Sequence, residues 1–405
     1  MSNFGKLFIA WAILVLIAGR SHAQGTAVTR PSSSTLFRPY SDVVEGTFTS
    51  LPFQISAYGS VGYDDNIFTS HENRQGSGFD ALGLDLATHI GNARTQLDAD
   101  LQAGFIDYWD RPGGSVDPDI ALNLNFTYQI SPRLLVGISS STVYQAQPSF
   151  SLGVGTVNAV GNYLYTSNVF SLAYQWTHRF STVTSYNINA LYYDDAAIGT
   201  TQNRLEHVFA QQFRFLVLPA ILAVAEYRFA YEQYLSTNFD SYSNFLLGGA
   251  DVVLGPRLLF TFRVGAELRT ELFSGGEDQT YPFFESSLGY AYQPNSYVQW
   301  YNRFGLEQSD LTIGGVKKVY RTGIRVLHSF GAKLKLTVGA FYSHNQYNQP
   351  FSFNENDLDI SVGANYQITR TLALQAGYTF TRVFSEIVTQ DYYRNRVFIG
   401  LNYAF

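Results

Sequence analysis

The sequence has no cysteine, a single methionine and few charged residues. Without cysteine, the fold cannot depend on disulfide bonds or on cysteine-based metal sites. Charged residues make up 14% of the chain, against about 25% in a typical soluble domain. Beyond the N-terminus, no apolar run reaches the roughly 20 residues that a membrane-spanning helix needs. The composition therefore argues against an ordinary soluble domain and against a helical membrane protein.

Sequence motifs for common chemistry are also missing. The chain contains no H-E-x-x-H, G-x-S-x-G or Walker motif and no Cys/His metal pattern. The formal net charge of −6 does not favour nucleic acid as a partner. We therefore expect no enzyme activity, no catalytic residues, no cofactor and no bound metal. Asp64, Asp65 and Asn66 could supply oxygen ligands to Ca²⁺, but three close oxygen side chains are weak support for a site.

Aromatic residues are abundant, at 16% of the chain. At the C-terminus, alternate positions are apolar and the residues between them are mostly smaller or more polar: Val397, Ile399, Leu401, Tyr403 and Phe405. This alternation is typical of a β-strand with one apolar and one polar face. A transmembrane β-barrel needs such a strand at its end, because its last strand pairs with its first to close the sheet. Tyr403 and the terminal Phe405 also resemble the assembly signal of bacterial outer-membrane barrels.

The same alternation recurs along the chain, as in residues 120–130, 258–268 and 358–368. About eighteen such runs begin near residues 53, 79, 95, 119, 134, 163, 183, 204, 221, 243, 258, 282, 297, 318, 333, 356, 371 and 393. Short turns alternate with longer loops rich in Gly, Asn and Ser, which is the asymmetry of outer-membrane barrels. We predict an all-β fold, a transmembrane antiparallel up-and-down β-barrel of about 18 strands, with 16 strands as the alternative and both termini in the periplasm.

Two soluble folds also contain many strands. A β-sandwich alternates, but its polar face would carry more Lys and Glu, and this length would require two or more domains. A β-propeller needs a repeat of roughly 40–50 residues with a blade signature. The sequence shows only a two-strand hairpin period, so the barrel is the better interpretation.

The N-terminal segment differs from the rest. Lys6 precedes an apolar stretch from Leu7 to Gly19, and Ser21-His22-Ala23 forms a small-residue cleavage site. We predict a signal peptide at residues 1–23, a periplasmic linker at 24–52 and the barrel at 53–405. A single membrane anchor is the alternative for the first segment. Localisation in the outer membrane of a Gram-negative cell, after signal-peptide cleavage, follows from this division.

Charged residues within the predicted strands share the phase opposite to the apolar one, so they would line the lumen. Strands near residues 79 and 95 present an acidic wall of Asp85, Asp98 and Asp100. The facing strands present a basic wall, formed by Arg263, Arg269, Arg303, Arg321, Arg325 and Lys335. We hypothesise that a transverse field crosses the lumen and orients solutes. The alternative is that these charges hydrate the lumen or pair with neighbours such as Glu226.

The segment Gly59–Phe68, which contains Tyr63-Asp64-Asp65-Asn66, follows the predicted signal and linker at the end of the first strand. In this position it resembles the β-barrel porin family 2. The resemblance implies an outer-membrane barrel associated with exopolysaccharide or exosortase-type surface systems. It implies contacts with outer-membrane lipid and lipopolysaccharide, with the barrel-assembly machinery and with polysaccharide-export components. It carries no catalytic residue over, and the oligomeric state stays open.

We therefore expect an outer-membrane porin-like channel for small solutes, or one that exports a surface polysaccharide. An alternative is a non-transporting barrel that acts as an adhesion or assembly scaffold through its outer loops. A third is an outer-membrane hydrolase with His71 or His344 at its rim. Residues 146–161, in the third long loop, could partly constrict a pore.

Overall fold

The computed structural model describes residues 53–149, 159–254, 257–273, 276, 278–309, 316–347 and 352–405. The predicted signal peptide (1–23) and linker (24–52) lie outside these residues, as does the greater part of the loop predicted to constrict the pore. All described residues fall within the predicted barrel (53–405). In that part, no helix is long or apolar enough to cross a bilayer.

Eighteen antiparallel strands form one sheet, and each strand pairs with the next along the chain. They are β1 (Phe53–Asp64), β2 (Ser77–Gly91), β3 (Thr95–Tyr108), β4 (Val116–Ser131), β5 (Leu134–Gln145), β6 (Tyr163–Gln175), β7 (Phe180–Tyr193), β8 (Arg204–Leu218), β9 (Ile221–Tyr234), β10 (Ser241–Val253), β11 (Leu258–Glu271), β12 (Gln279–Gln293), β13 (Ser296–Gln308), β14 (Val316–Phe330), β15 (Leu334–Tyr347), β16 (Phe353–Gln367), β17 (Leu372–Ser385) and β18 (Tyr392–Ala404). Each begins within three residues of its predicted start. The prediction of eighteen strands is confirmed, and the alternative of 16 is wrong.

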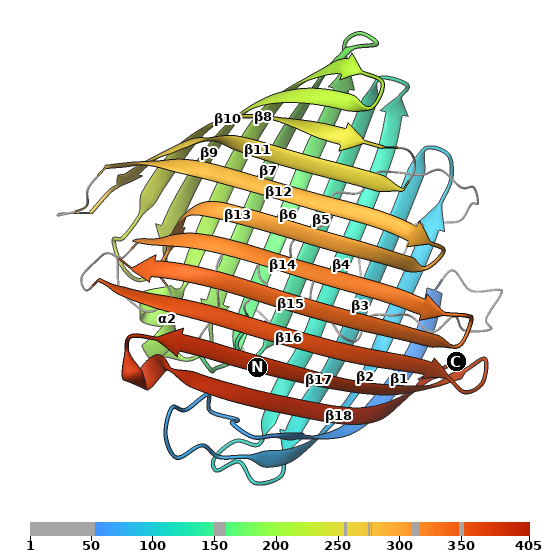
Figure 1. The fold of residues 1–405 in the computed structure, drawn as a ribbon, viewed down its shortest axis with the longest axis vertical. Coiled ribbons are helices and arrows are strands. Elements are labelled where there is room, and N and C mark those ends of the chain that lie inside the picture. The colour runs from blue at the N-terminus through green and yellow to red at the C-terminus, as the bar shows by residue number, and fades with distance from the viewer. Residues whose placement is uncertain are drawn as a thin grey trace.

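The barrel closes through pairing of β1 with β18, in a register that runs from Ser56–Ala404 to Asp64–Arg396. Figure 1 shows the strands following one another around the barrel, with β18 returning beside β1. Short turns join the strands at one end, and longer loops join them at the other. Two long loops contain a helical turn, α2 (Ala196–Gln202) and the 3-10 helix η3 (Val388–Gln390). Both chain ends of the barrel lie at the short-turn end, because the strand count is even.

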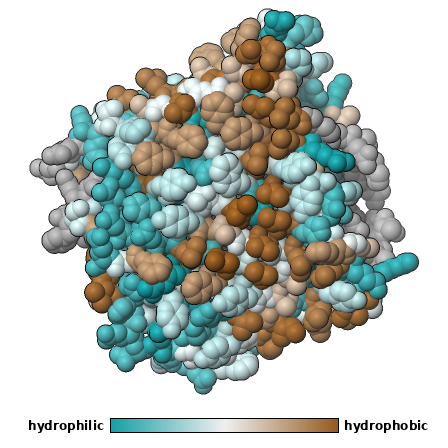
Figure 2. Space-filling view, viewed as in Figure 1, coloured by the Kyte–Doolittle hydropathy of each residue, from teal (hydrophilic) through white to brown (hydrophobic). Residues whose placement is uncertain are grey.

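The two faces of the sheet differ as the alternation predicts. On β18, the side chains of Val397, Ile399 and Leu401 are about half exposed, at 50%, 52% and 48%. Their neighbours Asn402 and Ala404 point inward and are 3% and 1% exposed. A hydrocarbon environment makes this segregation favourable, because a polar or charged side chain on the outer face would lose its hydration. Figure 2 shows apolar side chains spread over the outer face, with hydrophilic ones gathered towards the edge that carries the long loops.

Glycines on the inner face accommodate large side chains from neighbouring strands. The ring of Tyr58 on β1 lies over Gly83 on β2 and Gly104 on β3. A Cβ atom at Gly83 would lie 2.5 Å from the Tyr58 ring, and one at Gly104 would lie 2.3 Å from its hydroxyl oxygen. Only glycine leaves room for the ring here, so these positions fix where the Tyr58 hydroxyl sits in the lumen.

At the long-loop end, apolar side chains pack inside the barrel. Ile67, from the loop after β1, is fully buried against Phe79, Tyr108 and Phe398. A second group joins Tyr163, Tyr165, Leu191 and Tyr193 on β6 and β7. The buried apolar side chains therefore form several small clusters, with polar side chains of the inner face between them.

Candidate functional site

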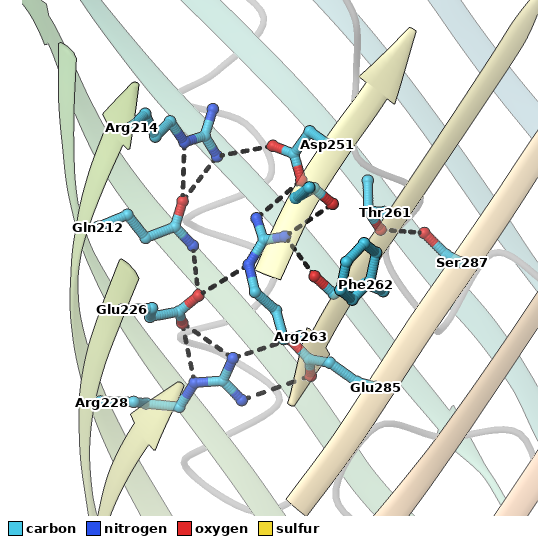
Figure 3. Close-up of polar contacts among 11 residues, drawn as sticks. Gln212, Arg214, Glu226, Arg228, Asp251, Thr261, Phe262, Arg263, Glu285 and Ser287 are labelled. Carbon is cyan, nitrogen blue, oxygen red and sulfur yellow. Dashed lines mark hydrogen bonds and ion pairs between the residues drawn. The ribbon is translucent and has the colours of Figure 1, made fainter. Parts of the chain in front are cut away.

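A polar assembly on the inner face spans β8 to β12 (Figure 3). Its members are three arginines, three carboxylates and one amide: Arg214, Arg228, Arg263, Glu226, Asp251, Glu285 and Gln212. Alternation along each strand places all seven on the lumenal side, since the same strands turn Phe213, Tyr227 and Val264 outward. Pairing with an opposite charge offsets part of the hydration that a charged side chain loses on burial.

Arg228 and Arg263 hold this assembly together. The Arg228 guanidinium lies 2.9 Å from a carboxylate oxygen of Glu226 and 2.9 Å from one of Glu285. Arg263 Nη2 lies 2.8 Å from Asp251 Oδ1, and its Nε lies 3.5 Å from Glu226 Oε2. Arg263 therefore joins β9 and β10 from its position on β11.

Gln212 completes the assembly from β8. Its amide nitrogen donates to Glu226 Oε2 at 2.8 Å, and its carbonyl oxygen accepts from Arg214 Nη2 at 2.6 Å. Arg214 also lies 3.8 Å from Asp251. The cluster has equal numbers of positive and negative groups, so it adds polarity and little net charge to the lumen.

Nearer the long loops, two further groups of ion pairs follow. Arg269 lies 2.6 Å from Glu271 and 3.5 Å from Glu232, which also lies 3.2 Å from Arg204. On β13 and β14, Glu307 pairs with Arg321 and lies 3.6 Å from Arg303. Most of the predicted basic wall is thus interleaved with carboxylates that sequence reasoning did not assign to it.

A lumenal cavity of about 290 Å³ lies between these groups, lined by residues of β6 to β11 and β13. Its charged lining consists of Glu206, Glu226, Glu232, Glu267, Glu307, Arg228, Arg269 and Arg303. The neutral part of the lining includes Ser167, Asn187, Tyr165 and Phe245. The cavity therefore offers hydrogen-bonding groups of both kinds and two aromatic faces to a small hydrophilic solute.

The predicted acidic wall lies on the inner face of β2 and β3. Asp85 accepts hydrogen bonds from Ser56 Oγ at 3.4 Å and Asn402 Nδ2 at 3.5 Å. Asp98 bonds the His89 ring, and Asp100 follows on the same face of β3. Asp119 on β4 extends the wall and accepts from Gln102 at 3.0 Å. The sequences of β2, β3 and β4 contain no Lys or Arg.

The structure thus places each predicted lumenal residue on the inner face. It surrounds Arg263, Arg269, Arg303 and Arg321 with carboxylates. Arg325 stands opposite Gln299 on β13, and Lys335 stands opposite Ser329 near the short-turn end. For the four arginines, these contacts favour local pairing over an unopposed basic wall. The transverse field stays a prediction.

The segment Tyr63–Asn66 lies where β1 meets β18. Asp64 is fully buried, and its carboxylate accepts hydrogen bonds from both Nε and Nη2 of Arg394. Asp65 accepts from the backbone nitrogen of Asn395 at 2.6 Å and from its side chain at 2.7 Å. Asn66 donates to the carbonyl oxygen of Tyr393 at 3.0 Å. These contacts join β1 to β18. They account for the Asp-Asp-Asn sequence through barrel closure, with no need for a bound cation.

The remaining candidate residues lie apart from one another. His71 Nδ1 lies 2.6 Å from the carbonyl oxygen of Asp391, while His344 Nδ1 lies 2.9 Å from Asn356 Oδ1. Tyr403 on β18 and Phe405, which follows the strand, are 46% and 47% exposed, with ring centroids 5.2 Å apart. Among the residues that the structure describes, no group of three or more His, Asp or Glu side chains could hold a metal ion.

Comparison with known protein families gives a match over residues 44–405 to the family described as "Putative beta-barrel porin 2". The chain belongs to this family. Its members are porins, so the protein is a porin-like β-barrel of the outer membrane, as the resemblance of Gly59–Phe68 implied. In such barrels the short turns face the periplasm and the long loops face the exterior. A search of curated proteins gave no match.

Among solved structures, the chain is similar to several outer-membrane porins. Acinetobacter baumannii OccAB4 is 11% identical, with 88% of this chain and 99% of that chain covered and a TM-score of 0.41. A BenF-like porin from Pseudomonas fluorescens Pf-5 is 10% identical, with 87% and 99% covered and a TM-score of 0.43. Pseudomonas aeruginosa OpdK, solved with vanillate, is 9% identical, with 87% and 99% covered and a TM-score of 0.44.

Proposed function

We propose that the protein is a passive channel for small hydrophilic solutes, with a preference for neutral and cationic ones. The observation that carries this proposal is the polar lining of the inner face, where ion-paired groups on β9, β11 and β13 line a cavity of about 290 Å³. Barrels of 16–18 strands generally enclose an aqueous channel. A lining of paired charges provides hydrogen bonds without holding one ion tightly.

The preference for cations rests on four strands whose own sequences contain carboxylates but no Lys or Arg. Within β2, β3, β4 and β16 the sequence has no Lys or Arg, yet these strands place several carboxylates on the inner face: Asp85, Asp98, Asp100, Asp119, Asp357 and Asp359. Fixed negative charge on a lumen wall raises the local concentration of cations and lowers that of anions.

Liposome swelling tests the channel directly. Purified, folded protein is inserted into liposomes, and the rate of swelling is measured in uncharged sugars of increasing size. We expect swelling in small sugars that falls with solute size. The matched control is the same amount of heat-denatured protein. Swelling no faster than in that control, at any sugar size, would contradict the proposal.

Export of a surface polysaccharide is the second candidate. The inner face of β5 and β7 supports it, because neutral polar side chains suited to sugar hydroxyl groups gather there: Ser139, Ser141, Asn187 and Asn189. The aromatic rings of Tyr163 and Tyr165 lie on β6 between these strands. Oligosaccharides of graded length would then block the ion current through the barrel for longer as their length increases.

A scaffold that adheres or assembles through its long loops is the remaining candidate, and an outer-membrane hydrolase is a weaker one. A scaffold would give no ion current in planar bilayers even when folded. A hydrolase would turn over lipid or peptide and would lose that turnover in a His71→Ala or His344→Ala variant.

A further inference from the structure

The short turns at the periplasmic end carry positive charge. Six of the eight turns contain a single Lys or Arg, and none contains Asp or Glu. These cations are all exposed: Arg94, Arg133, Arg179, Arg257, Lys333 and Arg370. The loops at the opposite end contain many carboxylates, so the barrel is polarised along its axis although its net charge is −6. A ring of fixed cations attracts anions to this mouth.

Two adjacent turns in this ring enclose a second cavity, of about 350 Å³. Arg133 from the turn between β4 and β5, and His178 and Arg179 from the turn between β6 and β7, line it together. No Asp or Glu belongs to its lining. Within the part of the chain that the structure describes, no ion pair joins Arg133 or Arg179 to a carboxylate. Arg133 and Arg179 differ in this respect from the arginines deeper in the lumen, which are paired with carboxylates.

The floor of this cavity is apolar. Leu135, Ala173, Leu216 and Leu222 line it from positions that the strand register places on the inner face. Leu135 is 42% exposed, which is unusual for an apolar side chain on the water-facing side of a barrel. An exposed apolar patch bordered by charge is typical of a binding site, because a ligand that covers it removes apolar surface from water.

The walls of the cavity are held by their own hydrogen bonds. Gln175 N donates to Arg133 O at 2.8 Å, and Leu216 N donates to Arg179 O at 2.8 Å. Thr177 Oγ1 accepts from Phe180 N at 3.0 Å, which fixes the turn that carries His178 and Arg179. The two guanidinium groups are therefore presented from fixed backbone positions, which lowers the entropy lost on binding.

We infer that this second cavity, at the periplasmic end of the barrel, binds an amphipathic anion. Its carboxylate or phosphate head would lie between Arg133 and Arg179, and its apolar body would lie on Leu135, Leu216 and Leu222. Arginine is suited to both head groups because its guanidinium donates two parallel hydrogen bonds. The inference goes beyond the proposed channel, and binding at this site does not require conduction. The head group could belong to a free solute or to a lipid.

Binding of octanoate to the full chain in phosphatidylcholine nanodiscs tests the inference. Calorimetric titration, corrected with empty nanodiscs, should give saturable binding. The pair Arg133→Gln and Arg179→Gln should weaken it at least about tenfold, as expected for the loss of two charge-assisted hydrogen bonds. The pair Arg94→Gln and Arg370→Gln removes the same charge elsewhere on the ring and should leave the affinity within about twofold. Circular dichroism confirms folding of each variant.

The source of the anion is separated by lipid composition. Phosphatidylglycerol placed in the nanodiscs should compete with octanoate where a lipid head group occupies the site, and should leave octanoate binding unchanged where a free solute does. Either result agrees with the inference. Absence of saturable binding would overturn it, and so would equal weakening by the two variant pairs or equal affinity for octanol, which lacks the charge.

Discussion

Asp64 on β1 and Arg394 on β18 form a buried ion pair between residues that are 330 positions apart in the sequence. Asp64 is 0% exposed, and Arg394 reaches both of its carboxylate oxygens. The neighbouring pair, Asp65 and Asn395, adds two hydrogen bonds to the same junction. The first and last strands are therefore joined by side chains as well as by the backbone ladder, at the end nearest the long loops.

Replacement of Arg394 by Gln should destabilise this junction. The variant removes the guanidinium that bonds the buried Asp64 carboxylate and leaves Arg396, opposite Asp64 in the ladder, as a nearby cation. Breaking a buried pair generally costs about 3–5 kcal/mol, and we expect a loss at the lower end of this range. Reversible unfolding of the protein in urea, from lipid vesicles, measures the change in free energy through tryptophan fluorescence. Glu72→Gln is the matched control, because Glu72 is an exposed carboxylate in the neighbouring loop. Equal stability of the Arg394→Gln variant and the control would show that the Asp64–Arg394 pair does not stabilise the junction between β1 and β18.

The two faces of β15 predict unequal losses of stability when a lysine is introduced on each. Val338 is 44% exposed and points outward near the middle of the strand, while the adjacent Thr337 points inward. Val338→Lys should reduce the free energy of unfolding by about 2–4 kcal/mol, because the ammonium group meets hydrocarbon. Thr337→Lys places the same charge in the lumen and should change stability much less. The two variants are compared by the same urea titration, and a similar loss in both would contradict the assignment of faces.

The fit of Tyr58 over Gly104 predicts a non-additive pair of variants. Gly104→Ala places a methyl group where the Tyr58 hydroxyl lies, so the ring must move, and we expect a loss of about 1–3 kcal/mol. In a Tyr58→Ala background the added methyl group no longer meets the ring, but the Leu82 carbonyl oxygen stays 2.6 Å from it, so the same substitution should cost less than in the wild-type protein. A double-mutant cycle in unfolding free energy measures this coupling. Strictly additive losses of unfolding free energy would show that the Tyr58 ring does not lie over Gly104.

The strands and their facing were predictable because both depend on local periodicity. On β18, the alternation of Val397, Ile399 and Leu401 with smaller or polar residues fixed the outward face, and the structure exposes these three side chains. The same reasoning located the turns, since Pro132 and Pro256 interrupt the alternation at the ends of long runs. A feature that repeats every two residues needs no knowledge of distant partners.

The partners of the lumenal arginines were not predictable in the same way. Arg263 stands opposite Gly249 in the ladder, yet its partner Asp251 is two residues further along β10. Such diagonal contacts depend on the register between strands and on the reach of long side chains, which the sequence of one strand does not contain. Alternation does place Asp251 and Glu285 on the inner face, so the sequence pattern could have identified both as lumenal residues.

The C-terminal aromatic residue predicts an effect on assembly that differs from stability. Phe405 is 47% exposed on the outer face, and its backbone nitrogen donates to Ile55 O at 2.9 Å. Phe405→Ala keeps that backbone bond. We expect less protein assembled in the outer membrane of cells, measured by the heat-modifiable fraction on gels, with an unchanged free energy of unfolding after refolding in vitro. Normal assembly of the Phe405→Ala variant in cells would show that Phe405 is not an assembly signal.

Charge in the lumen predicts how ion selectivity responds to substitution. Reversal potentials across planar bilayers in a potassium chloride gradient should show a preference for cations in the wild-type protein. Combining Asp85→Asn with Asp100→Asn removes two carboxylates from the acidic wall and should shift the reversal potential towards zero.

Neutralising Arg263, Arg321 and Arg325 together should strengthen the preference for cations, because Asp251 and Glu307 then each lose one of their cationic partners. The Val338→Ala variant, which alters the outer face alone, serves as the control and should conduct as the wild type does. If the arginine and aspartate variants leave the reversal potential unchanged, neither the transverse field nor the cation preference governs passage through this barrel.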